Sequence, residues 1–90
     1  MGVKAEISWR RNDAEGQRRD VYAQHVGSEW RFFCRERRFD PWQRVELPPL
    51  EDWLELLDAV ERRIARRLLR PEEADRVRRT IRESYPEAGV

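Results

Sequence analysis

The chain is short of the residues that most site chemistry requires. Among its 90 residues are one cysteine, one histidine and a single lysine, and no apolar run approaches the roughly 20 residues that cross a bilayer. One cysteine excludes an internal disulfide, and no cysteine and histidine cluster has the spacing of a zinc site. The first residues lack the pattern of a secretion signal. We therefore expect a cytoplasmic protein with no membrane segment, no metal and no cofactor.

Signatures of catalysis are missing as well. No serine or cysteine stands in a nucleophile turn, and no glycine-rich loop is present to cradle phosphate. His25 is expected to pack against Trp30, and Cys34 is expected to be buried and inert. We therefore predict that the protein is not an enzyme.

Charge is abundant but nearly balanced. Charged residues make up 41% of the chain, while the formal net charge is only +1. Residues 46–61 contain acids and no base, and residues 62–70 contain arginines and no acid. This segregation matches the dipole preference of one long helix and needs no ligand to explain it. Any binding of nucleic acid must therefore come from a local patch.

The middle of the chain has the pattern of a β-hairpin. Residues 20–26 and 29–38 alternate in polarity, and Gly27-Ser28 between them suits a type II′ turn. A two-residue loop fixes the register, which sets Tyr22 opposite Phe33. One face of the hairpin is then apolar, and the other carries these two rings among arginines.

The remaining pattern predicts the rest of the fold. A first strand is expected over about 3–11, and residues 42–47 form either a short fourth strand or an extended arm. Apolar periodicity predicts helices over about 50–69 and 71–84, with Leu54 on the apolar stripe of the first helix. Leu56 and Leu69 lie off that stripe and are candidates for contact with the second helix or with a second subunit, so a homodimer is a further expectation. The predicted class is α+β: a three- to four-stranded antiparallel meander followed by two helices packed on one sheet face, in one domain of residues 1–90.

Part of the sequence resembles a known family. The aromatic and arginine ending of residues 32–37, with the helix entry at Trp53 within residues 45–57, resembles the DNA-binding domain of the positive-cofactor-four transcriptional coactivators. The resemblance covers roughly residues 29–60. It implies a sheet that binds single-stranded DNA and a helix that dimerises, with Phe33 as a stacking ring and Arg35 and Arg37 as backbone contacts. Residues 40–44 depart from that family, whose lysine- and glycine-rich stretch is replaced here by DPWQR.

These observations predict a small binding domain for single-stranded DNA or RNA. Aromatic faces stack bases, and arginines follow the backbone of the strand. The expected stacking rings are Tyr22 and Phe33, and the expected phosphate contacts are Arg31, Arg35, Arg37 and Arg44. The simpler interpretation is that Tyr22 and Phe33 form an ordinary cross-strand pair that stabilises the hairpin. A protein–protein interaction module or an accessory subunit is the alternative function.

Overall fold

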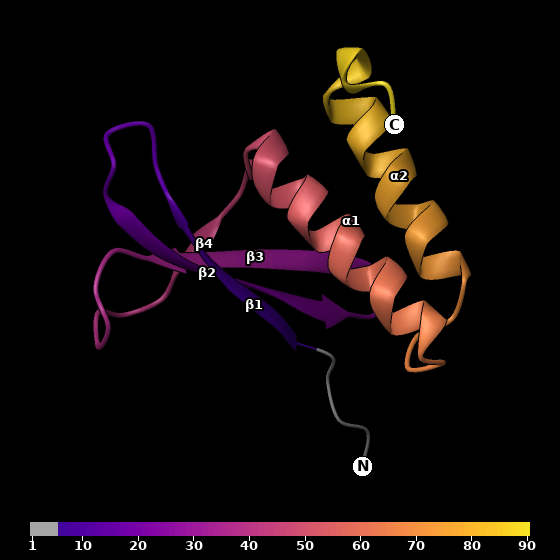
Figure 1. Ribbon diagram of the computed structural model, residues 1–90, viewed down its shortest axis with the longest axis horizontal. Coiled ribbons are helices and arrows are strands. Elements are labelled where there is room, and N and C mark those ends of the chain that lie inside the picture. The colour runs from indigo at the N-terminus through magenta and orange to yellow at the C-terminus, as the bar shows by residue number, and fades with distance from the viewer. Residues whose placement is uncertain (1–5) are drawn as a thin grey trace. The chain divides into compact units, whose positions relative to one another are not determined.

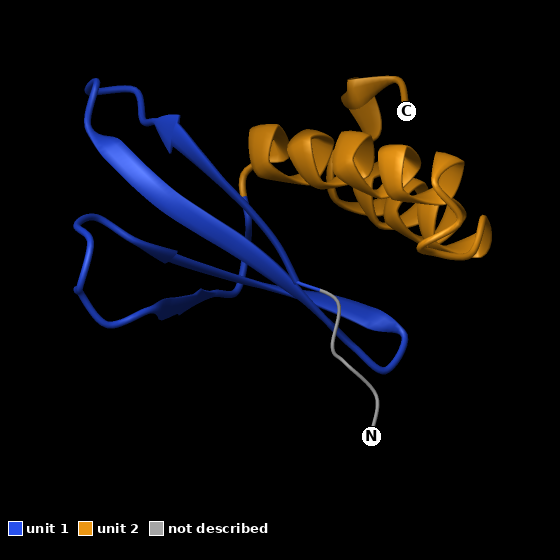
Figure 2. Cartoon of the chain, turned by 60° about the horizontal axis from the view of Figure 1, so that its bottom comes forward, with its two compact units in different colours: residues 1–48 blue, residues 49–90 orange. Residues whose placement is uncertain are grey.

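The computed structural model describes residues 6–90, and their contacts divide the chain into two compact units (Figure 2). Residues 1–48 make up the first unit and residues 49–90 the second. The first unit is an antiparallel sheet with strand order β1-β2-β3-β4 (Figure 1). The strands are β1 (Glu6–Asn12), β2 (Arg18–Val26), β3 (Glu29–Arg35) and β4 (Gln43–Val45). The second unit contains α1 (Leu50–Ala65), α2 (Glu72–Ser84) and the short 3-10 helix η1 (Pro86–Ala88).

This order of elements confirms the α+β class and the four-stranded meander followed by two helices. No helix within residues 6–90 is both long enough and apolar enough to span a membrane. That the whole chain forms one domain stays a prediction.

The register of the central hairpin is the one that its two-residue loop predicts. Tyr22 pairs with Phe33, and His25 pairs with Trp30. Gly27 has a φ of +62°, whereas Ser28 is not among the residues with positive φ, as a type II′ turn requires. Because side chains alternate along a strand, this register fixes which residues share each face of the sheet.

One face of the sheet carries its buried side chains. These are Ile7, Val21, Ala23, Trp30 and Phe32. Trp9 adds an edge-to-face contact with Phe32, with ring centroids 6.2 Å apart. Cys34 also lies on this face but is only half-buried, which is less than we expected.

The strand bounds differ from the predicted ones where turns intervene. β3 ends at Arg35 rather than at Arg38, because residues 37–40 close a turn. In that turn the Asp40 N–H donates to the Arg37 carbonyl at 3.0 Å, and the Arg37 N–H donates to the Asp40 carboxylate at 3.1 Å. β4 occupies only Gln43–Val45 of the 42–47 range. Residues 3–5 of the first predicted strand lie outside the described residues.

A tight loop also starts β2 earlier than residue 20. The Asp13 carboxylate accepts the Gln17 and Glu15 N–H groups, each at 2.9 Å, and it also accepts a hydrogen bond from Arg19. These hydrogen bonds, of which the one from the Gln17 N–H has the largest effect, lower the pKa of Asp13 below its usual range. The ordered loop extends the β1–β2 ladder to the pair Asn12 and Arg18.

The first helix ends earlier than its sequence pattern predicts. The Leu68 N–H donates to the Arg63 carbonyl at 2.8 Å, and the Arg67 N–H donates to the Ile64 carbonyl at 2.9 Å. This is the Schellman arrangement, with Arg67 at a φ of +60° in the position where glycine is usual. Because no glycine stands there, the sequence predicted helix up to residue 69.

The buried face of α1 is also rotated from the predicted stripe. Leu56 is fully buried, whereas Leu54 is 40% exposed and Leu68 lies exposed beyond the end of the helix. The prediction that placed Leu54 on the stripe and Leu56 off it is therefore wrong. Spacing of i, i+3, i+4 and i+7 links Trp53, Leu56, Leu57 and Val60, all of which are buried. α1 contacts α2, whose buried residues are Glu73, Ala74, Val77 and Ile81.

Candidate nucleic-acid interface

The sheet face opposite the buried one carries a stack of aromatic rings. The hairpin register brings Tyr22 of β2 and Phe33 of β3 together, with ring centroids 4.7 Å apart and ring planes 13° apart. Arg44 of β4 is the neighbour of Phe33 on its other side. Both rings are half-buried. The predicted pairing of these two rings is therefore confirmed.

A third ring, Trp42, joins this pair and was missed from the sequence. Its centroid lies 4.7 Å from that of Tyr22, and the two planes meet at 83°. Trp42 directly precedes β4 and is 37% exposed. The signal was present, because Trp42 lies two residues before Arg44 and alternation puts both on one face. We call Tyr22, Phe33 and Trp42 the ring platform, and the sheet face that bears them the platform face.

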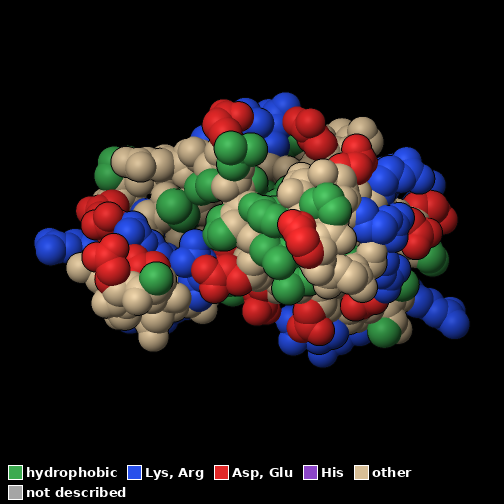
Figure 3. Space-filling view, turned by 90° about the horizontal axis from the view of Figure 1, so that it is seen from above, with side chains coloured by type: hydrophobic (Ala, Val, Ile, Leu, Met, Phe, Trp, Pro, Cys, Tyr) green, Lys and Arg blue, Asp and Glu red, His purple; other side chains and the backbone are tan. Residues whose placement is uncertain are grey.

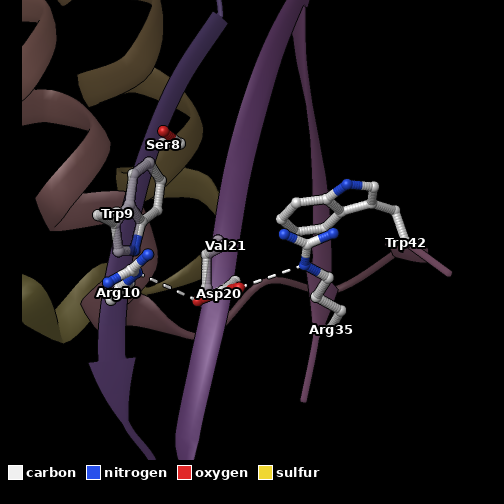
Figure 4. A pocket seen from close by; sticks show the side chains of 7 residues that line it. All are labelled: Ser8, Trp9, Arg10, Asp20, Val21, Arg35 and Trp42. Carbon is white, nitrogen blue, oxygen red and sulfur yellow. Dashed lines mark hydrogen bonds and ion pairs between the residues drawn. The ribbon is translucent and has the colours of Figure 1, made fainter. Parts of the chain in front are cut away.

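Arg35 is held beneath Trp42 by two contacts. Its guanidinium carbon lies 4.1 Å from the centre of the Trp42 ring, in a cation–π contact. Its Nε also donates to the Asp20 carboxylate at 3.2 Å. The other carboxylate oxygen of Asp20 forms a second ion pair and lies 3.5 Å from the Nε of Arg10 (Figure 4). One carboxylate therefore pairs with guanidinium groups from two strands.

A shallow cavity of about 410 Å³ lies beside this cluster. Figure 4 shows its lining side chains: Ser8, Trp9, Arg10, Asp20, Val21, Arg35 and Trp42. The lining combines an indole face, N–H donors and one carboxylate. Such a surface suits a flat ring bearing polar edges.

The other predicted phosphate contacts divide into two groups. Arg31 and Arg44 lie on the platform face, but each has an acidic neighbour: Arg31 Nε is 2.9 Å from Glu29, and Arg44 Nε is 3.8 Å from Glu46. Arg37 is not on the strand, because β3 ends before it. The prediction that Arg37 extends the row of strand arginines is therefore wrong, and Arg37 lies in the β3–β4 loop. Over residues 6–90, its side chain forms no ion pair.

Residues with potential for chemistry lie on the opposite face. His25 stacks on Trp30 with ring centroids 4.7 Å apart, as the register predicted. Within residues 6–90, no group of three or more His, Cys, Asp or Glu side chains is placed to hold a metal ion. The geometry of the platform face therefore offers stacking and charge pairing.

Burial, with a smaller contribution from Glu6, raises the pKa of Tyr22 above its usual value of about 10. Folding therefore favours the protonated phenol, and this stabilisation is present below pH 10 and lost as the pH rises through the folded pKa. In a Tyr85→Phe variant, which leaves one tyrosine, we expect a higher ionisation midpoint in buffer than in denaturant. Absorbance near 295 nm measures it, and equal midpoints would contradict the burial of Tyr22.

Comparison with protein-family models, curated proteins and solved structures found no match to this chain. The resemblance to the positive-cofactor-four coactivators stays a prediction.

Proposed function

We propose that this chain is a small non-catalytic module that binds a single strand of DNA or RNA on the platform face. One observation supports the proposal above all: three rings from separate segments gather on one face of the sheet, with an arginine stacked on one of them. Base–aromatic stacking contributes about 1–3 kcal/mol per base and tolerates any sequence. Because the chain has one cysteine, it forms no internal disulfide and does not need an oxidising compartment. The proposal therefore places the module in the cytoplasm.

The arginines have different roles in this proposal. Arg31 and Arg44 exchange their acidic neighbours for phosphate oxygens, since an exposed ion pair of this kind contributes only about 0–1 kcal/mol. Arg37 binds phosphate directly. Arg35 keeps Asp20 as its partner and orients the Trp42 ring. About three phosphates are then neutralised.

The test is a titration of the full chain against labelled oligothymidylate and oligouridylate of about 12 nucleotides, within the usual site size. With about three phosphates neutralised, log K is expected to fall with log salt at a slope of about −2. Affinity should then drop about 20-fold between roughly 50 and 200 mM salt. Fluorescence anisotropy measures both, and no change with either oligonucleotide at low salt would refute the proposal.

A protein-binding module is the second candidate, and the pairing of charges favours it. Arg10, Arg31, Arg35 and Arg44 all lie beside acidic residues of the same face. Acidic and basic side chains are also interspersed over the surface seen in Figure 3. Trp, Tyr and Arg are the residues most enriched at protein-binding hot spots. A protein partner, including a second copy of this chain, predicts that neither oligonucleotide changes the anisotropy, so the same titration separates the candidates.

A further inference from the structure

The loop between β3 and β4 carries an aromatic ring, that of Phe39, which the packing of the fold does not explain. Phe39 is 87% exposed, so its side chain adds little to any core. Its φ is +79°, in the left-handed region that a bulky residue rarely occupies. Glycine would adopt a positive φ here without strain, as Gly27 does in the β2–β3 turn. A strained backbone that presents an exposed ring points to a role in contact.

The turn holds this ring in place. Two hydrogen bonds join Arg37 and Asp40 across it, one between backbone groups and one to the Asp40 carboxylate. The guanidinium carbon of Arg38 lies 5.3 Å from the centre of the Phe39 ring. The ring is therefore presented from a closed turn with a cation at its face.

Two positive charges near the platform have no acidic partner among the described residues and lie in this loop. Among residues 6–90, neither Arg37 nor Arg38 forms an ion pair, in contrast to the paired Arg31, Arg35 and Arg44. Trp42 of the ring platform follows in the same loop. The loop that leads to the platform thus carries a flat ring and two guanidinium groups that have no carboxylate partner among the described residues.

We propose that the β3–β4 loop captures one unpaired base of that strand, with Phe39 stacking on the base and Arg37 and Arg38 binding the adjacent phosphates. This inference rests on the proposed function and adds a requirement for an unstacked base. It therefore predicts preference for flexible single strands over duplex, whose bases stay stacked on one another.

A lipid surface is the competing occupant, because an exposed ring with two arginines also suits a membrane interface. One phenylalanine, however, buries less apolar surface than a myristoyl chain, which by itself gives only marginal membrane binding. Stacking on a base needs just one ring face, and Trp42 of the ring platform follows three residues later in the same loop. The observations therefore favour nucleic acid.

The decisive variant is Phe39→Gly, which removes the ring and relieves the strained φ, so thermal stability is expected to be kept or raised. Its affinity for oligothymidylate should fall about tenfold, and Phe39→Trp should retain affinity. With Arg38 as a fourth phosphate contact the expected wild-type slope is about −2.8, and Arg37→Gln with Arg38→Gln should make it shallower by about 1.4. Leu47→Ala is the matched control, since Leu47 is 88% exposed and lies just beyond β4.

The outcomes separate this inference from the proposed function. The wild type should bind an oligonucleotide with one abasic position more weakly than the intact oligonucleotide. This difference in affinity should be smaller for Phe39→Gly. If the wild type binds oligothymidylate and Phe39→Gly binds equally well, the loop has no such role and the platform proposal stands. If the wild type binds no oligonucleotide but sediments with vesicles containing phosphatidylserine in a Phe39-dependent manner, the loop is a lipid contact and both proposals fail.

Discussion

Leu56→Ala is expected to lower the free energy of unfolding by about 2–5 kcal/mol, the range measured for buried leucines. Leu56 is fully buried on α1, so the substitution removes its packing and leaves a cavity. A domain of this size has about 5–15 kcal/mol of stability in total. The variant should therefore unfold at a much lower urea concentration than the wild type. A urea titration monitored by far-ultraviolet circular dichroism measures the two midpoints.

Leu54→Ala is the matched control on the same helix. Leu54 is 40% exposed, so its truncation is expected to change stability by about 1 kcal/mol or less. The comparison tests the orientation of α1 directly, because the sequence pattern had placed Leu54 inside and Leu56 outside. A larger loss from Leu54→Ala than from Leu56→Ala would show that the helix is rotated the other way.

The second large effect is expected on binding. The double variant Tyr22→Leu with Phe33→Leu keeps apolar side chains on the sheet but removes the two stacked rings. If each ring stacks one base, at about 1–3 kcal/mol each, affinity for oligothymidylate should fall at least about 30-fold. The salt slope should stay unchanged, because no cation is removed. Anisotropy at a fixed ionic strength measures the change.

Tyr22→Phe supplies the control for this variant, since it removes the hydroxyl and keeps the ring, and it should bind like the wild type. Thermal melting of both variants shows whether the sheet remains folded. Equal affinity of the double variant and the wild type, with the sheet folded, would leave Tyr22 and Phe33 as an ordinary cross-strand pair.

Much of the platform was predictable because a two-residue turn leaves one register. Gly27-Ser28 placed Tyr22 opposite Phe33 without any information from distant parts of the chain. Trp42 was predictable from the same alternation, but Asp40-Pro41 before it suggested a broken strand. Arg37 was misplaced because no glycine marks the turn that ends β3, and Phe39 takes the positive φ instead.

The same cause explains the misplaced end of α1. Arg67 adopts the left-handed conformation that glycine would have signalled, so periodicity alone carried the predicted helix too far. The rotation of α1 was hidden by an abundance of leucines, because several overlapping stripes satisfy a period of 3.6 residues. Which stripe is buried depends on tertiary contacts that local pattern does not contain.

Asp20 limits the net positive charge of the platform face. Its two oxygens form ion pairs with Arg10 and Arg35. Replacing this one side chain by a neutral residue would therefore remove both ion pairs at once. A single substitution at this position would therefore raise the positive charge of the platform face and strengthen its attraction for any polyanion.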